Sequence, residues 1–95
     1  MKGNTLNEFM DDLYSMGGPE KEFLYNGKRY FLQCEVIPNS NFIELVIFKC
    51  FDNQEYIFKA TGKSFSECVE QFEQAKIFDG KTIYEVEKDI EVLFG

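Results

Sequence analysis

Four segments between residues 21 and 61 can be paired into one antiparallel sheet, and this pairing constrains the fold more than any other feature of the sequence. Asn26-Gly27 favours a tight type I′ hairpin turn, because both central positions of that turn need a positive φ. Further turn-forming residues stand at 38–41 and 52–53. The sequence therefore predicts a four-stranded antiparallel meander with strands at 21–25, 28–37, 42–51 and 54–61.

The lengths of the three turns set the register of this meander. Phe23 is expected opposite Tyr30, and Leu45 is expected between Cys34 and Ala60. Directly paired side chains share a face, and a slip of one residue would scatter them. One face, here called the first face, thereby collects apolar side chains from all four strands: Phe23, Tyr25, Tyr30, Leu32, Cys34, Val36, Ile43, Leu45, Ile47, Tyr56, Phe58 and Ala60.

The opposite, second face carries a smaller apolar group among charged residues. Its members are Leu24, Phe31, Val46, Phe48 and Ile57. Contiguous exposed apolar surface usually marks an interface, so this group predicts a binding surface for another protein or for a second copy of the chain. The helix expected at the N-terminus could instead cover this group, because layered folds often cover both faces of a sheet. The residues leave both readings open.

Three capping-box patterns predict the starts of three helices, because their hydroxyl and carboxylate side chains satisfy free backbone N–H groups. Thr5-x-x-Glu8 opens a helix that extends to Met16 and ends at Gly17-Gly18-Pro19. Ser64-x-x-Glu67 and Thr82-x-x-Glu85 open two C-terminal helices with apolar stripes. The predicted fold class is α+β, with both C-terminal helices packed on the first face and all 95 residues in one domain.

Charge is distributed unevenly along this chain, whose net charge is −7. Residues 21–63 hold six basic and five acidic side chains, whereas residues 64–95 hold three lysines and eight acids. Such a balance disfavours direct binding to nucleic acid or to an anionic membrane and leaves a basic protein as a partner.

The acidic residues of the two C-terminal helices suggest a second hypothesis for the function. They could form a surface that occupies the nucleic-acid-binding groove of a basic protein, as an acidic decoy or inhibitor does. The residues of this surface are Glu67, Glu70, Glu73, Glu85 and Glu91. Solubility alone accounts for the same charges, because net charge commonly keeps proteins soluble.

The sequence lacks two features of common active sites, although its 17 acidic residues leave paired-acid chemistry open. It has no histidine, which excludes Ser-His-Asp and Cys-His catalysis, and it has no glycine-rich phosphate-binding loop. Its cysteines are Cys34, Cys50 and Cys68, an odd number outside any C-x-x-C motif, which indicates free thiols in a reducing compartment. Cys34 and Cys50 are expected on opposite faces, which argues against a metal site.

The N-terminal residues lack the apolar core of a signal peptide, and the longest apolar run, at residues 45–48, is too short to span a bilayer. We therefore expect a cytoplasmic protein that is not an enzyme and that has no cofactor. Protein–protein interaction is the predicted function, with a homodimer as one form of it.

Two segments resemble a group of small uncharacterised bacterial proteins. Residues 77–91 (Ile-Phe-Asp-Gly-Lys-Thr-Ile-Tyr-Glu-Val-Glu-Lys-Asp-Ile-Glu) resemble the ending of those proteins, and residues 25–31 (Tyr-Asn-Gly-Lys-Arg-Tyr-Phe) resemble one of their hairpins. In the similar endings a tryptophan is expected soon after the Ile-Glu pair, where this chain has Val92, Leu93 and Phe94. Many such proteins are associated with plasmids, phages or conjugative elements, so the resemblance implies an accessory role in that setting. It implies no functional residue.

Overall fold

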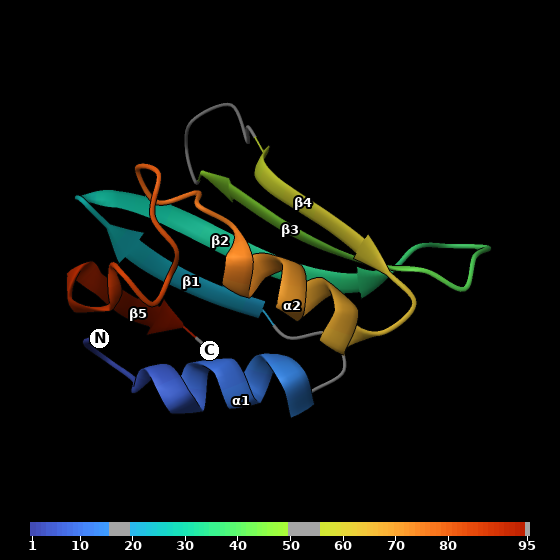
Figure 1. The fold of residues 1–95 in the computed structure, drawn as a ribbon, viewed down its shortest axis with the longest axis horizontal. Coiled ribbons are helices and arrows are strands. Elements are labelled where there is room, and N and C mark those ends of the chain that lie inside the picture. Colours follow the sequence, from blue (N-terminus) through green and yellow to red (C-terminus); the bar gives the residue numbers. More distant parts are fainter. Residues whose placement is uncertain (16–19, 50–55, 95) are drawn as a thin grey trace.

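The structure, a computed structural model, describes residues 1–15, 20–49 and 56–94. Within these ranges the chain forms an α+β fold with one antiparallel sheet, as the sequence predicts, but the sheet has five strands instead of four (Figure 1). The order of the strands in the sheet is β4-β3-β2-β1-β5. The elements in chain order are α1 (Leu6–Ser15), β1 (Glu20–Tyr25), β2 (Lys28–Val36), β3 (Ile43–Lys49), β4 (Tyr56–Gly62), α2 (Phe65–Gln74), the 3-10 turn η1 (Glu87–Asp89) and β5 (Ile90–Phe94).

The structure confirms the strand pairs from which the register of the meander was predicted. Phe23 lies opposite Tyr30, and Leu45 lies between Cys34 and Ala60. At the first turn Asn26 has a φ of 51° and Gly27 a φ of 74°, as a type I′ turn requires. The predicted turn at residues 52–53 lies outside the described residues.

One irregularity alters the pairing of β3 with β4. The register shifts between Ile47 and Phe48, so that Tyr56 lies opposite Phe48. The prediction of Tyr56 on the first face is therefore wrong, because an extra residue in one strand moves the side chains beyond it to the other face. Ile57 is the extra residue, and it packs against the main core.

The predicted last helix is wrong, because the chain after Thr82 forms one turn, then η1 and β5. The capping box of Thr82 and Glu85 does form, since the Thr82 N–H donates to the Glu85 carboxylate at 3.0 Å, but it closes only that turn. β5 then pairs with β1, with Ile90 opposite Tyr25 and Val92 opposite Phe23. The apolar residues of this segment fit a strand as well as a helix, and the open edge of β1 selects the strand.

Contacts before and beside β5 hold the strand at this edge. The Asp79 carboxylate accepts hydrogen bonds from the Tyr25 hydroxyl at 2.9 Å and from the Asn26 amide at 3.0 Å. These bonds join the turn at residues 78–81 to the first hairpin. On the outer side of β5, the Lys2 N–H donates to the Ile90 carbonyl at 2.9 Å, and the Val92 N–H donates to the Lys2 carbonyl at 2.7 Å.

Both helices contact side chains of the first face. The ring of Phe9 in α1 lies 6.3 Å from that of Phe23, and the ring of Phe72 in α2 lies 6.3 Å from that of Phe58. The two helices also contact each other, and the Tyr14 hydroxyl donates to the Glu73 carboxylate at 2.6 Å. The buried residues of α1 thus belong to the same core as those of α2. Neither described helix is long and apolar enough to cross a membrane.

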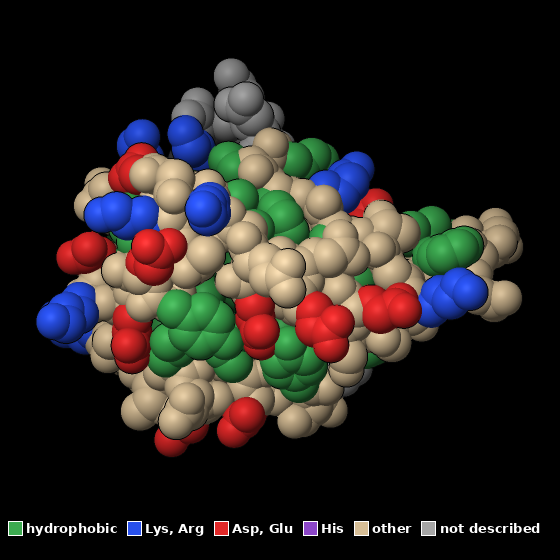
Figure 2. Space-filling model, viewed as in Figure 1, with side chains coloured by type: hydrophobic (Ala, Val, Ile, Leu, Met, Phe, Trp, Pro, Cys, Tyr) green, Lys and Arg blue, Asp and Glu red, His purple; other side chains and the backbone are tan. Residues whose placement is uncertain are grey.

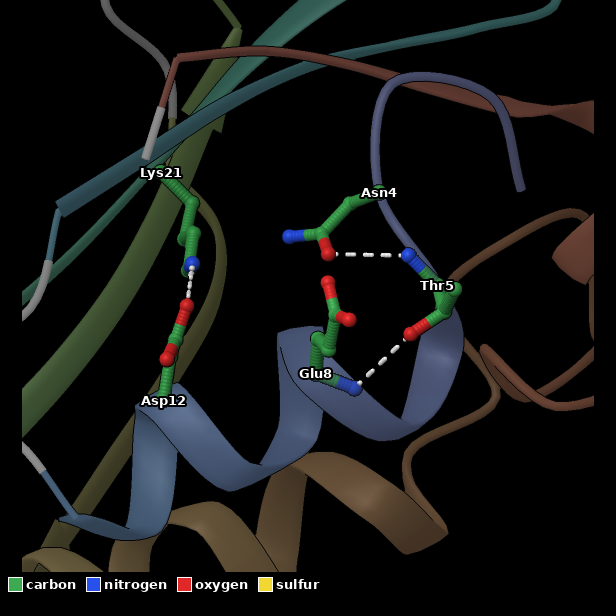
Figure 3. A network of polar contacts seen from close by, with 5 residues as sticks. All are labelled: Asn4, Thr5, Glu8, Asp12 and Lys21. Atoms are coloured by element: carbon green, nitrogen blue, oxygen red, sulfur yellow. Dashed lines mark hydrogen bonds and ion pairs between the residues drawn. The ribbon is translucent and has the colours of Figure 1, made fainter.

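A buried lysine joins α1 to the sheet. The Lys21 side chain, in β1, is only 2% exposed, and its ammonium lies 2.8 Å from the Asp12 carboxylate and 5.2 Å from the centre of the Phe9 ring. Figure 3 shows this ion pair beside the N-terminal cap of α1, where Thr5 Oγ1 accepts a hydrogen bond from the Glu8 N–H. The Asp12 side chain is 42% exposed, so water still solvates part of its charge.

We expect Asp12→Ala to destabilise the fold by about 1–3 kcal/mol and Lys21→Met to cost less. The first change removes the 2.8 Å carboxylate from a buried ammonium, whereas the second replaces the charge with an apolar side chain of similar length. Urea unfolding of the two variants measures both changes in the free energy of unfolding. If Lys21→Met lowered the free energy of unfolding more than Asp12→Ala, the expectation would be wrong. That result would show that the ion pair itself contributes net stability.

Candidate interaction surface

Three aromatic side chains form a row across the second face of the sheet. Phe31 and Phe48 are directly paired between β2 and β3, with ring centroids 5.4 Å apart. The ring of Tyr56, in β4, lies 5.8 Å from that of Phe48. Phe31 and Phe48 are half-buried, and Tyr56 is 58% exposed. We call these three residues the aromatic row, and they give this face a continuous apolar strip over three strands.

Four of the five residues predicted for an interaction surface lie on this face. Leu24, Phe31, Val46 and Phe48 all point to it, because their strand partners alternate with those of the first face. Val46 is buried, at 5% exposed. The fifth, Ile57, packs against the main core instead, and Tyr56 takes the place opposite Phe48. Nothing in the sequence around position 57 indicates that Tyr56, and not Ile57, lies on the second face.

Charged side chains occupy the other end of the second face. Glu35 lies directly opposite Glu44, a like-charge pair that water has to solvate. The Lys59 ammonium lies 3.9 Å from the Glu44 carboxylate and 5.3 Å from the centre of the Tyr56 ring. Lys59 therefore stands between the acidic end of the face and the aromatic row.

The structure does not bring the five predicted acidic residues together. Glu67, Glu70 and Glu73 lie on α2 as expected, and Figure 2 shows a row of acidic side chains over the side of the molecule that α2 covers. Glu85 lies in the turn before η1, where its hydrogen bonds with Thr82 hold the pKa of its carboxyl below the usual value. Glu91 lies in β5 beside Leu24, on the second face. Both were expected on a helix that does not form.

The carboxylates of α2 differ in what surrounds them. Glu67 and Glu70 are exposed, whereas Glu73 is half-buried and accepts the hydrogen bond of Tyr14. Burial and the Glu73 carboxylate both raise the pKa of Tyr14. Glu73 thus connects α2 to α1, and only Glu67 and Glu70 remain as a pair of exposed carboxylates on this helix.

The two described cysteines are core residues. Cys34 and Cys68 are 2% and 0% exposed. Burial raises the pKa of the Cys34 thiol to about 12 and also raises that of Cys68. Cys50 lies outside the described residues. Elsewhere in the described chain no three cysteine, aspartate or glutamate side chains gather as a metal site would need.

We expect Cys34 and Cys68 to resist thiol reagents at pH 8 until the chain unfolds. With a pKa of about 12, only about one Cys34 side chain in 10⁴ is a reactive thiolate at that pH, against roughly a quarter of ordinary cysteines. Mass spectrometry after iodoacetamide treatment, in native buffer and in urea, measures which cysteines are modified. Rapid modification of both residues in the native state would contradict their burial.

No protein-family model matches this chain, and neither the curated proteins nor the solved structures contain a match. The resemblance of residues 77–91 to the endings of small bacterial proteins stays a prediction.

Proposed function

We propose that this protein is a protein–protein interaction module that forms a homodimer through the second face of its sheet. The observation that carries the proposal is the aromatic row, in which Tyr56 is 58% exposed beside two half-buried phenylalanines. Aromatic side chains are enriched at the centres of protein interfaces, because they bury a large area with few rotatable bonds. Adjacent strands hold the three rings, so little order has to be gained on binding.

A second copy of the chain is the partner that fits the distribution of charge. Each copy carries a net charge of −7, and most of that charge lies outside residues 21–63, which hold six basic and five acidic side chains. Two copies that meet through the sheet therefore repel each other less than two copies that meet through the acidic residues of α2. A two-fold axis would place the same aromatic row on both sides of the contact, as an isologous interface requires.

Sedimentation velocity over a concentration series tests this proposal. We expect wild-type protein to dimerise and Phe48→Glu to weaken dimerisation at least about 30-fold, because a carboxylate would be desolvated in the contact. Tyr84→Glu is the matched control, since Tyr84 is 49% exposed and lies in the turn before η1. We expect this control to dimerise as the wild type does.

Far-UV circular dichroism checks that both variants keep the fold. A wild-type chain that stays monomeric at millimolar concentration would contradict the proposal. So would a Phe48→Glu variant that dimerises like the wild type.

A further inference from the structure

The outer edge of β4 carries backbone groups that a further strand could pair with. β4 is the terminal strand in the sheet order, and in the described chain no strand lies beyond it. The Thr61 carbonyl accepts a hydrogen bond from the side-chain amide of Gln71 at 2.9 Å. A further strand that paired at Thr61 would take the place of that amide. Because edge groups alternate along a strand, the N–H and carbonyl of Lys59 point to the same edge.

A polar groove runs beside this edge. It has a volume of about 440 Å³ and lies between the end of β4 and one flank of α2, which packs beside that strand. Its lining residues are all exposed and polar, and none is basic: Thr61, Glu67, Glu70, Gln71 and Gln74. Glu73, which contacts α1 through Tyr14, does not line the groove.

The two carboxylates of the groove are placed by the chain around them. Glu67 stands in the first turn of α2 and accepts a hydrogen bond from the Lys63 N–H, which fixes its side chain near the end of β4. Glu70 follows three residues later on the same exposed flank. An extended chain on the edge of β4 would direct every second side chain toward α2, within reach of these carboxylates.

We propose that the edge of β4 binds an extended segment, rich in lysine or arginine, of a partner protein as a sixth strand of the sheet. The segment displaces the Gln71 amide from the Thr61 carbonyl and forms main-chain hydrogen bonds with Thr61 and Lys59. Its basic side chains contact Glu67 and Glu70. Main-chain pairing supplies the affinity in such strand addition, and the side chains of the segment supply the selectivity.

The charges of the groove favour a basic segment over a second copy of the chain. A copy paired through its own β4 would bring its own Glu67 and Glu70 toward the same carboxylates, and each copy has a net charge of −7. This surface is separate from the second face that we propose for dimerisation, so either proposal can fail without the other.

Binding of a labelled peptide to the full chain tests the inference. The probe is a nine-residue peptide that alternates lysine and threonine, its counterpart alternates glutamate and threonine, and fluorescence anisotropy measures both affinities. We expect binding of the lysine peptide only, weakened about tenfold in the double variant Glu67→Gln and Glu70→Gln. The matched control removes two charges elsewhere on exposed positions, by Asp11→Asn and Glu20→Gln, and should change the affinity little.

Two further readouts separate strand addition from attraction of charge alone. Gln71→Ala should strengthen binding, because the peptide no longer competes with the side-chain amide. Hydrogen exchange should slow at the Lys59 and Thr61 amides when the lysine peptide binds. Equal binding of the two peptides, unchanged exchange at these amides, or loss of self-association on changing Glu67 and Glu70 would each overturn the inference.

Discussion

Removal of residues 90–95 is expected to abolish the cooperative unfolding transition of this protein. Ile90 and Val92 are 1% and 9% exposed, and their strand covers the edge of β1. Losing one buried side chain of this size costs about 2–5 kcal/mol, and a domain of this length has a total stability of roughly 5–14 kcal/mol. Two such side chains and a strand pairing together therefore account for most of the stability available.

Urea titration followed by circular dichroism measures the effect. Leu93→Ala is the control within the same strand, because Leu93 is 38% exposed and its truncation should cost less than about 1 kcal/mol. If the C-terminal residues formed a peripheral helix, as the capping box at Thr82 suggests, the truncated chain would still unfold cooperatively. A cooperative transition in the truncated chain would therefore contradict the position of β5.

Phe23→Ala and Phe31→Ala are expected to differ strongly in their effect on the dilute monomer. Phe23 is fully buried on the first face, with ring contacts to Phe9, Tyr30 and Phe78. Its truncation should cost about 3–5 kcal/mol, because the cavity cannot collapse within this close-packed aromatic cluster. Phe31 lies one strand away on the second face and is half-buried, so its truncation should cost about 1 kcal/mol.

Thermal or urea unfolding gives both values when it is done at a concentration at which sedimentation velocity shows only the monomer. The contrast depends on which sheet face the helices cover. Equal destabilisation by the two substitutions would show that both faces are buried in the monomer, and it would remove the surface on which the proposed dimer depends.

The meander could be predicted from the sequence because its signals are local. The Asn26-Gly27 turn and the lengths of the other turns determine the pairing, and pairs such as Cys34 with Leu45 then follow. The helix that starts after Ser64 was also predictable, since Ser64 caps it through the Glu67 N–H. The irregularity beside Ile57 was not predictable, because the extra residue leaves no local pattern.

Contacts between distant segments decided what the sequence left open. Thr82 and Glu85 form their capping box whether one turn or a whole helix follows, and the free edge of β1 determines the outcome. The apolar stripe of α1 fits either face of the sheet. In the structure its buried side chains join the core on the first face, while Asp12 contacts Lys21 of β1 and Tyr14 contacts Glu73 of α2.

The candidate interaction surface was also predictable only where its residues depend on local signals. The register alone places Leu24, Phe31, Val46 and Phe48 on one face of the sheet, as the structure does. Glu85 and Glu91 do not join the predicted acidic surface, because the helix on which they were expected does not form. The sequence around Lys21 does not indicate that this residue is buried, because its partner Asp12 lies in a different element.

In the proposed dimer, two copies of the chain contact each other through the second face of the sheet. Amide NMR spectra over a dilution series test this contact directly. We predict concentration-dependent shifts at Phe31, Val46, Phe48 and Tyr56, with constant positions for the exposed residues of α2 such as Glu70. Spectra that do not change with concentration, or shifts that cluster on α2, would contradict it.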